Sequence, residues 1–203
     1  MPGLLEIAVA ALIASGAQGT SPPAGARATG QPAALTLEIR AFNAAEDVTS
    51  HTRLTVHRAG ERAEAIPHAR SGDGRVTLQV PAGIYDVQAI LERDGRVVNI
   101  RWANRLVVMP YPDEEGRHLE VINFRNGFGA LQVRVDDGPA PDVTIFEGSK
   151  RDKPAGTPLA GTRYTLFVVP AGIYDVQVRK GPKVTWMTGV EVPLDRTRLS
   201  IIK

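Results

Sequence analysis

The chain has 203 residues, 43% hydrophobic and 23% charged, which is typical of a globular protein rather than a disordered chain or a coiled coil. It contains no cysteine, which excludes disulfides, thiolate metal sites and a lipid anchor on cysteine. The formal net charge of +2 is too small to indicate binding to nucleic acid.

The N-terminal residues differ in composition from the rest of the chain. An apolar run at 7–14 is followed by small residues, and it is shorter than the roughly 20 residues that a membrane span needs. No basic residue precedes the run, but the pattern favours a secretory signal peptide at 1–19, cleaved after Ala17 or Gly19. Residues 20–33 are rich in Pro, Gly and Ala and predict a flexible linker. The mature chain is therefore expected to be periplasmic or secreted, without a transmembrane span.

A nine-residue segment, VPAGIYDVQ, occurs at 80–88 and again at 169–177. Several further segments match in the same order, which predicts an internal duplication with one copy at 34–124 and the other at 125–203. The matched segments alternate apolar and polar residues, which is the period of a half-buried strand, and turn residues separate them. We therefore expect an all-β fold of two tandem β-sandwich domains with about seven strands each.

The repeated segment is expected to end one strand at its proline and to begin the next after a turn. Gly83 and Gly172 are expected to adopt a positive φ in that turn. Tyr85 and Tyr174 are expected to point into the core and to bond nearby backbone through their hydroxyls. The segment thus indicates a fold and is not expected to bind a ligand.

Each copy also contains one tryptophan, Trp102 or Trp186, which follows apolar residues at a spacing of two. This spacing favours packing of both rings in the core. An exposed aromatic platform for sugars is the alternative.

The order of these elements resembles bacterial Ig-like or prealbumin-like sandwich repeats: a strand, the segment V/L-P-A-G-x-Y-x-V, a hairpin, and a strand that contains Trp. Such repeats include carboxypeptidase regulatory-like domains and the β-modules that accompany von Willebrand A domains, and the resemblance covers 34–203. It implies a non-catalytic accessory role in the cell envelope, as a spacer, adhesion or assembly module. Transthyretin-like hydroxyisourate hydrolases share a similar sandwich, but their Tyr-Arg-Gly-Ser signature does not occur in this sequence.

Residues suited to catalysis or metal binding form no recognised motif. His51, His57 and His68 are near one another in sequence, but their spacing matches no ligand pattern and the second copy lacks them, so exposed or hydrogen-bonded histidines are favoured. There is no nucleophile elbow, no H-E-x-x-H and no phosphate-binding loop. The sequence therefore predicts no metal, no cofactor and no enzyme activity, with a hydrolase as the least favoured function.

Binding residues are expected where the two copies differ, because loops vary without disturbing a core. The first copy has extra loop residues that include a tyrosine between prolines followed by acidic residues, and the second copy has a basic cluster suited to an anionic envelope polymer. The candidate binding residues are Tyr111, Asp113, Glu114, Lys150, Arg151 and Lys153.

A structural or interaction module of the bacterial cell envelope is the favoured function. Its partner is expected to be a protein or an envelope polysaccharide, and not nucleic acid. A carbohydrate-binding module that uses exposed aromatic residues is the alternative.

Overall fold

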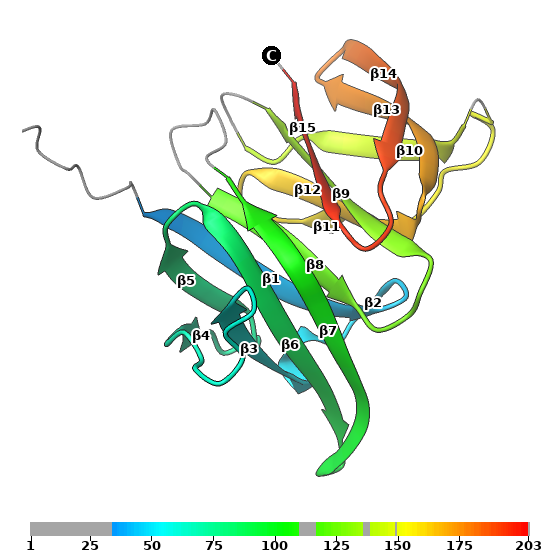
Figure 1. Ribbon diagram of the computed structural model, residues 1–203. Helices are drawn as coiled ribbons and strands as arrows, with labels where there is room; N and C mark the ends of the chain where they lie inside the picture. The colour runs from blue at the N-terminus through cyan, green and yellow to red at the C-terminus, as the bar shows by residue number, and fades with distance from the viewer. Residues whose placement is uncertain (1–33, 110–116, 136–138, 149, 203) are drawn as a thin grey trace, which may run out of the picture. The chain divides into compact units, whose positions relative to one another are not determined.

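The computed structural model (Figure 1) describes residues 34–109, 117–135, 139–148 and 150–202. Within them the regular structure is β, apart from one 3-10 turn, η1 (Thr49–His51). No helix in these ranges is long and apolar enough to cross a membrane. The predicted signal peptide and linker lie outside the described residues.

The described residues of the first half, 34–124, form two sheets. Its strands are β1 (Leu35–Asn43), β2 (Glu46–Asp47), β3 (Thr52–Arg58), β4 (Ala69–Arg70), β5 (Val76–Val80), β6 (Gly83–Arg93), β7 (Arg96–Val108) and β8 (Arg117–Asn123). One sheet has the order β4-β5-β1-β8, with β2 paired to the end of β1, and the other has the order β3-β6-β7. β1 pairs antiparallel with β5 and parallel with β8, and Figure 1 shows β1 and β8 side by side.

The second half, 125–203, also forms two sheets. Its strands are β9 (Phe128–Val135), β10 (Asp142–Glu147), β11 (Leu159–Ala160), β12 (Tyr164–Pro170), β13 (Gly172–Lys180), β14 (Lys183–Val192) and β15 (Thr197–Ile202). One sheet has the order β11-β12-β9-β15 and the other the order β10-β13-β14. β9 pairs antiparallel with β12 and parallel with β15. The pairing pattern of the first half therefore recurs in the second.

In each half the two sheets contribute alternate residues to one apolar cluster. Leu37 and Ile39 of β1 are fully buried against Val56 of β3 and Val87 of β6, as the period of two predicts. The matching cluster of the second half contains Leu131 and its neighbours on β9, β10, β12 and β13. The all-β, sandwich-like prediction is confirmed.

A third apolar cluster lies on the other face of two of these sheets. It joins β1 and β8 of the first half to β9 and β12 of the second, and its buried members are Phe42, Leu119, Val121, Ala130, Leu166 and Val168. Because these side chains come from both halves, burying them stabilises the contact between the halves. The cluster lies beside the cleft described below.

The repeated segment confirms one expectation and contradicts another. The hydroxyls of Tyr85 and Tyr174 each donate a 2.7 Å hydrogen bond to a proline carbonyl four residues earlier, Pro81 O and Pro170 O, and both rings are buried. Neither glycine of the segment is among the glycines with positive φ, so that expectation is wrong. The chain turns at this point without a left-handed residue.

The expected core packing of the two tryptophans is also wrong. Trp102 lies opposite Gln88 in register, on the face of β6 that turns away from the core, because facing residues in a sheet share a side. Val98 and Ile100, which precede it at a spacing of two, are 58% and 54% exposed. Trp186 lies opposite Gln177 in the same way. The spacing identified a strand correctly but assigned its apolar residues to the wrong face.

Candidate functional site

Charged and polar side chains gather in a cleft of about 500 Å³ formed by residues of both halves. The walls come from β1, β8, β9 and the turn between β11 and β12, together with the residue before β5. The polar and charged lining residues are Glu38, Arg75, Arg117, His118, Gln132, Thr162, Arg163, Arg134 and Tyr164. Among the described lining residues, four arginines thus surround a single carboxylate.

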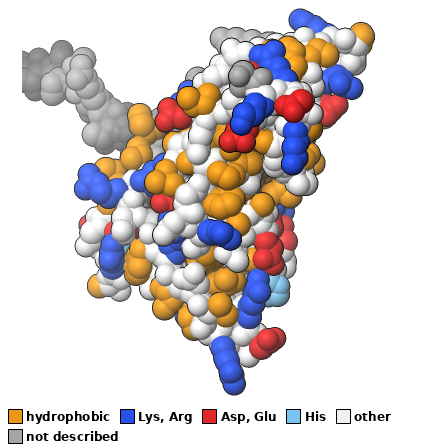
Figure 2. All heavy atoms as spheres, turned by 90° about the vertical axis from the view of Figure 1, so that its right-hand side faces the viewer, with side chains coloured by type: hydrophobic (Ala, Val, Ile, Leu, Met, Phe, Trp, Pro, Cys, Tyr) orange, Lys and Arg blue, Asp and Glu red, His pale blue; other side chains and the backbone are white. Residues whose placement is uncertain are grey.

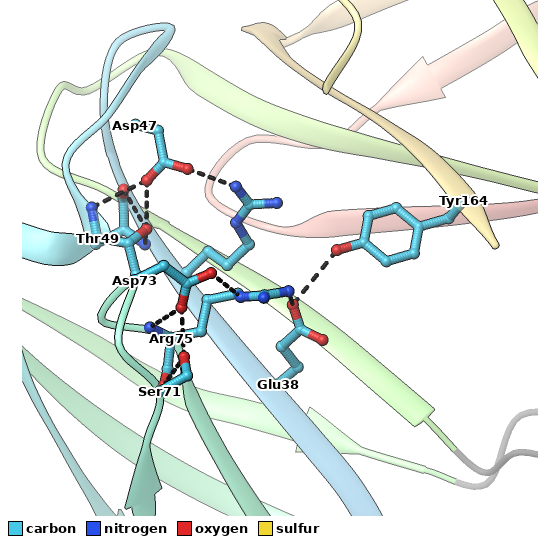
Figure 3. A network of polar contacts seen from close by, with 9 residues as sticks. Glu38, Asp47, Thr49, Ser71, Asp73, Arg75 and Tyr164 are labelled. Atoms are coloured by element: carbon cyan, nitrogen blue, oxygen red, sulfur yellow. Dashed lines mark hydrogen bonds and ion pairs between the residues drawn. The ribbon is translucent and has the colours of Figure 1, made fainter. Parts of the chain in front are cut away.

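Glu38 contacts side chains from both halves in this cleft (Figure 3). Its Oε1 accepts a hydrogen bond from the Tyr164 hydroxyl at 3.3 Å and forms an ion pair with Arg75 Nη1 at 3.6 Å. Arg75 also pairs with Asp73 at 2.6 Å, which fixes its guanidinium beside the turn that leads into β5. Strands distant in sequence therefore hold one polar network in place.

The phenol of Tyr164 is a hydrogen-bond donor in this network. Burial, and next the negative charge of Glu38, raise the pKa of Tyr164 above its ordinary value. The hydroxyl consequently stays protonated at neutral pH, since even an unperturbed tyrosine has a pKa near 10. A protonated phenol suits binding, whereas a general base would need a lowered pKa.

Buried polar residues form the inner part of the cleft. Gln132 and Arg134 of β9 are 4% and 8% exposed. His118 of β8 is equally buried, and its Nε2 lies 2.8 Å from Oε1 of Glu120. Buried charges are costly unless they are paired or hydrogen-bonded, so the inner part of the cleft depends on such polar contacts.

A glycine fits the wall of the cleft closely against Tyr164. A Cβ placed on Gly161 would lie 2.6 Å from Cζ of the Tyr164 ring. Any larger residue would therefore clash with the ring unless the ring or the turn moved. The shape of this wall depends on the absence of a side chain at Gly161.

Local sequence explains why these groups reach the cleft. Glu38 alternates with the core residues Leu37 and Ile39 on β1, and Gln132 alternates with Leu131 and Val133 on β9. The polar faces of the two strands therefore point away from their own cores. In the folded chain these faces border the contact between the halves instead of facing water.

Three of the six sequence-predicted binding residues, Lys150, Arg151 and Lys153, do not line this cleft. Tyr111, Asp113 and Glu114 lie outside the described residues. Lys150 and Lys153 are exposed, and Lys150 borders a different hollow. The guanidinium of Arg151 bonds Oδ2 of Asp175 at 2.9 and 2.7 Å and lies 4.2 Å from the Trp186 ring centroid. Arg151 is therefore paired with Asp175 of its own half.

Sequence reasoning missed a charged cluster that occurs in both halves. Asp86 accepts hydrogen bonds from the backbone N–H of Arg105 at 2.9 Å and from Arg62 Nε at 3.3 Å, and Arg62 lies 4.3 Å from the Trp102 ring centroid. Asp175 corresponds to Asp86 in the repeated segment.

The second half builds the same cluster from the same residue types. Asp175 accepts from the backbone N–H of Gly189 at 3.1 Å and from Arg151, which covers Trp186. Arg62 and Arg151 are 89 residues apart, as are Asp86 and Asp175, and this shared offset was a usable signal. Because an arginine covers one face of each tryptophan ring, that face is closed to a stacked sugar.

The histidines form no metal site within the described part of the chain. His57 is buried, its Nδ1 lies 3.0 Å from the carbonyl oxygen of Glu64, and its ring packs 5.7 Å from Trp102. His68 Nδ1 lies 2.9 Å from the carbonyl oxygen of Ile66. Both are hydrogen-bonded histidines, as favoured from the sequence, whereas His51 is exposed.

Other surface features offer less for a ligand. A hollow of about 560 Å³ has two charged residues among its described lining, Glu147 and Lys150, and the other described residues there are mainly small and apolar. Large apolar side chains are exposed at Val97, Val98 and Ile100 of β7. Figure 2 shows hydrophobic side chains gathered over the middle of one face, with charged groups above and below them. The described residues of the hollow and of the exposed part of β7 do not bring polar groups together as those of the cleft do.

No protein-family model and no curated protein matches this sequence. Among solved structures, the Bacillus anthracis TIE protein is 16% identical with a TM-score of 0.30; the match covers 84% of this chain, which spans 34% of that chain's length. A DUF3823 family protein from Bacteroides ovatus is 10% identical over 78% of this chain and 98% of its own, with a TM-score of 0.27. A protein from the same species, provisionally described as an adhesin, is 12% identical over 91% and 95%, with a TM-score of 0.29. Such low scores carry no argument about function.

Proposed function

We propose that the chain is a non-catalytic binding module of the bacterial cell envelope that holds its ligand in the cleft between the two halves. The module consists of two copies of one Ig-like or prealbumin-like sandwich domain, at 34–124 and 125–203, and residues 1–19 direct its export. The single observation that carries the binding role is the convergence of buried polar and charged side chains from both halves on one cleft.

Repetition in the structure supports the two-copy architecture. The strand pairing of β1 with β5 and β8 recurs as that of β9 with β12 and β15. The bond from tyrosine to a proline carbonyl and the cluster of aspartate, arginine and tryptophan each occur once per half. One ancestral sandwich that was duplicated explains all of these together.

The chemistry of the cleft supports binding over catalysis. Tyr164 keeps its proton, and its hydroxyl and the Arg75 guanidinium both engage the carboxylate of Glu38. A nucleophile needs a neighbouring base that accepts its proton, and these groups instead pair with one another as donors and acceptor. A ligand would meet donors and acceptors that are already fixed in position, which favours recognition.

Retention of the full chain on isolated bacterial envelopes tests this function. The chain, tagged at its C-terminus, is expected in the periplasmic or secreted fraction of a bacterial host and to sediment with purified envelope fragments. Thr162→Trp should lower the retained fraction about tenfold, because the indole would occupy the exposed wall of the cleft.

Thr157→Trp is the matched control, since Thr157 is exposed but does not line the cleft. It should leave retention unchanged. Equal retention of the wild type and of Thr162→Trp would contradict a binding role for the cleft. A chain found entirely in the cytoplasm would contradict the export proposal.

A further inference from the structure

The arginines of the cleft determine the charge of what it can bind. Arg75 and Arg117 belong to the first half, and Arg134 and Arg163 belong to the second. A guanidinium presents a planar fork of donors that fits carboxylate, sulfate and phosphate groups. Because the arginines stand on both walls, a ligand with several acidic groups contacts more of them than a single small anion does.

The remaining polar residues of the cleft are suited to hydroxyl groups. Glu38 presents a carboxylate acceptor and Gln132 an amide that both donates and accepts. Thr162 and Tyr164 of the second half add hydroxyls. Sugar rings offer many hydroxyls that act as donors and acceptors at once, whereas the backbone of an acidic peptide offers none.

The size of the cleft fits such a ligand. Its volume of about 500 Å³ falls within the range of roughly 300–1,000 Å³ that is usual for ligand sites. Among the described lining residues, the apolar side chains are those of Leu119 and Ala160, beside the ring of Tyr164. The cleft is therefore unlike the apolar pockets that accept lipids or aromatic compounds.

We propose that the cleft binds an acidic polysaccharide, a chain of sugars that bears carboxylate, sulfate or phosphate groups. Arginines from both halves pair with the acidic groups, while Glu38, Gln132 and Thr162 bond the hydroxyls. This inference rests on the proposed function, because it assigns a ligand class to the same cleft.

Titration calorimetry of the full chain with four defined probes tests the ligand class. The probes are oligogalacturonate, dextran sulfate, neutral dextran and poly-L-glutamate of similar length. At least one of the two acidic saccharides should bind at least tenfold more tightly than both dextran and polyglutamate. The affinity should fall as salt is raised from about 0.05 to 0.5 M, because exposed charges are screened.

The pattern of binding distinguishes the alternatives. Preference for oligogalacturonate indicates carboxylate groups on the ligand, and preference for dextran sulfate indicates sulfate or phosphate. Polyglutamate binding as tightly as the acidic saccharides would overturn the saccharide assignment in favour of an acidic protein. Equal binding of dextran would overturn the role of charge, and no binding of any probe would overturn the ligand class altogether.

Charge-removing variants test the role of the arginines. Arg117→Gln and Arg163→Gln alter exposed rim residues, and each should weaken binding of the acidic saccharide about tenfold. Arg58→Gln and Arg96→Gln remove the same charge from exposed positions that do not line the cleft and should leave the affinity unchanged. Equal losses in both pairs would show attraction by overall charge alone and would overturn the site.

Failure of this inference is distinguishable from failure of the proposed function. If Thr162→Trp abolishes retention on envelopes but no acidic saccharide binds, the cleft is a binding site and the ligand class is wrong. If Thr162→Trp has no effect on envelope retention, the proposed function itself is wrong.

Discussion

Asp86 and Asp175 lie on the outer faces of β6 and β13, yet they are only 4% and 5% exposed. The pKa of Asp86 is lowered, first by the hydrogen bond from the Arg105 backbone N–H and then by those from Gly60 and Arg62, which outweigh its burial. The pKa of Asp175 is lowered first by Arg151 and then by the Gly189 backbone N–H. Each carboxylate thus ties a loop and a neighbouring strand to the sheet.

These lowered pKa values predict a dependence of stability on pH. A carboxylate whose pKa is lower in the folded than in the unfolded state, where it is about 3.9, stabilises the protein above that value, and this contribution is lost as the pH falls through the folded pKa. Asp86→Asn should therefore lower the free energy of unfolding by about 1 kcal/mol at pH 7, and by less at pH 3. Asp175→Asn should act in the same direction.

Urea denaturation at pH 7, 5, 4 and 3 measures this difference. Glu61→Gln, at an exposed position, is the control and should track the wild type at each pH. A gap between Asp86→Asn and the wild type that stays constant down to pH 3 would show that the charge of Asp86 is not what stabilises the fold.

At the scale of elements, the two long hairpins share one irregularity. Strand β6 pairs with β7, and β13 with β14, with a bulge directly after the tyrosine of the repeated segment. The residue on the partner strand has a positive φ in both hairpins, 56° at Arg105 and 67° at Gly189. Its N–H is the one that bonds the aspartate. The bulge therefore directs a backbone donor at the buried carboxylate.

Replacing the residue with positive φ is predicted to change the free energy of unfolding in opposite directions at the two bulges. Arg105→Gly should raise the free energy of unfolding by about 0.5–1 kcal/mol, because a left-handed conformation costs a residue with a Cβ more than it costs glycine. Gly189→Ala should lower it by about 1 kcal/mol through the backbone alone, since an added Cβ would meet no atom within 4 Å.

Chemical denaturation of both variants measures these changes. Gly95→Ala, at a turn position with a φ of 73° and open space around it, should behave like Gly189→Ala. A loss of stability in Arg105→Gly would show that the Arg105 side chain contributes more than its backbone strain costs.

For the whole molecule, the third apolar cluster decides whether the halves unfold together. Leu166 is fully buried in this cluster beside Phe42 and Val168, and Val121 of β8 donates its N–H to the Thr197 hydroxyl of β15 at 3.0 Å. Arg101 of the first half pairs with Asp195 of the second at 2.6 Å. Apolar burial and polar contacts thus link the two sandwiches.

Weakening this link should uncouple the halves. The wild type is expected to unfold in one calorimetric transition, whereas Leu166→Ala should lose about 2–5 kcal/mol and broaden or split the transition. Leu131→Ala makes the same change in the core of the second half. It should lower the melting temperature of that half and leave the third apolar cluster intact. Unchanged cooperativity in Leu166→Ala would contradict the role of the cluster.

Local sequence was sufficient for the strands, the cores and the tyrosine bonds, because each depends on residues close together in the chain. Alternation placed Leu37 and Ile39 inward correctly. It failed for Trp102, because β7 has apolar residues on both of its faces, and alternation alone does not show which face meets the core. It also gave no hint of the cleft, whose arginines are scattered from Arg75 to Arg163.

The sequence by itself determined an all-β chain with one strand pattern repeated twice, since side-chain alternation and turn residues act over a few residues. Only the tertiary structure decided what happens to the polar faces of β1 and β9. Glu38 and Gln132 sit on faces that a single sandwich would leave in water, and the contact between the halves encloses them. That contact joins residues about ninety positions apart, and local periodicity contains no information at that distance.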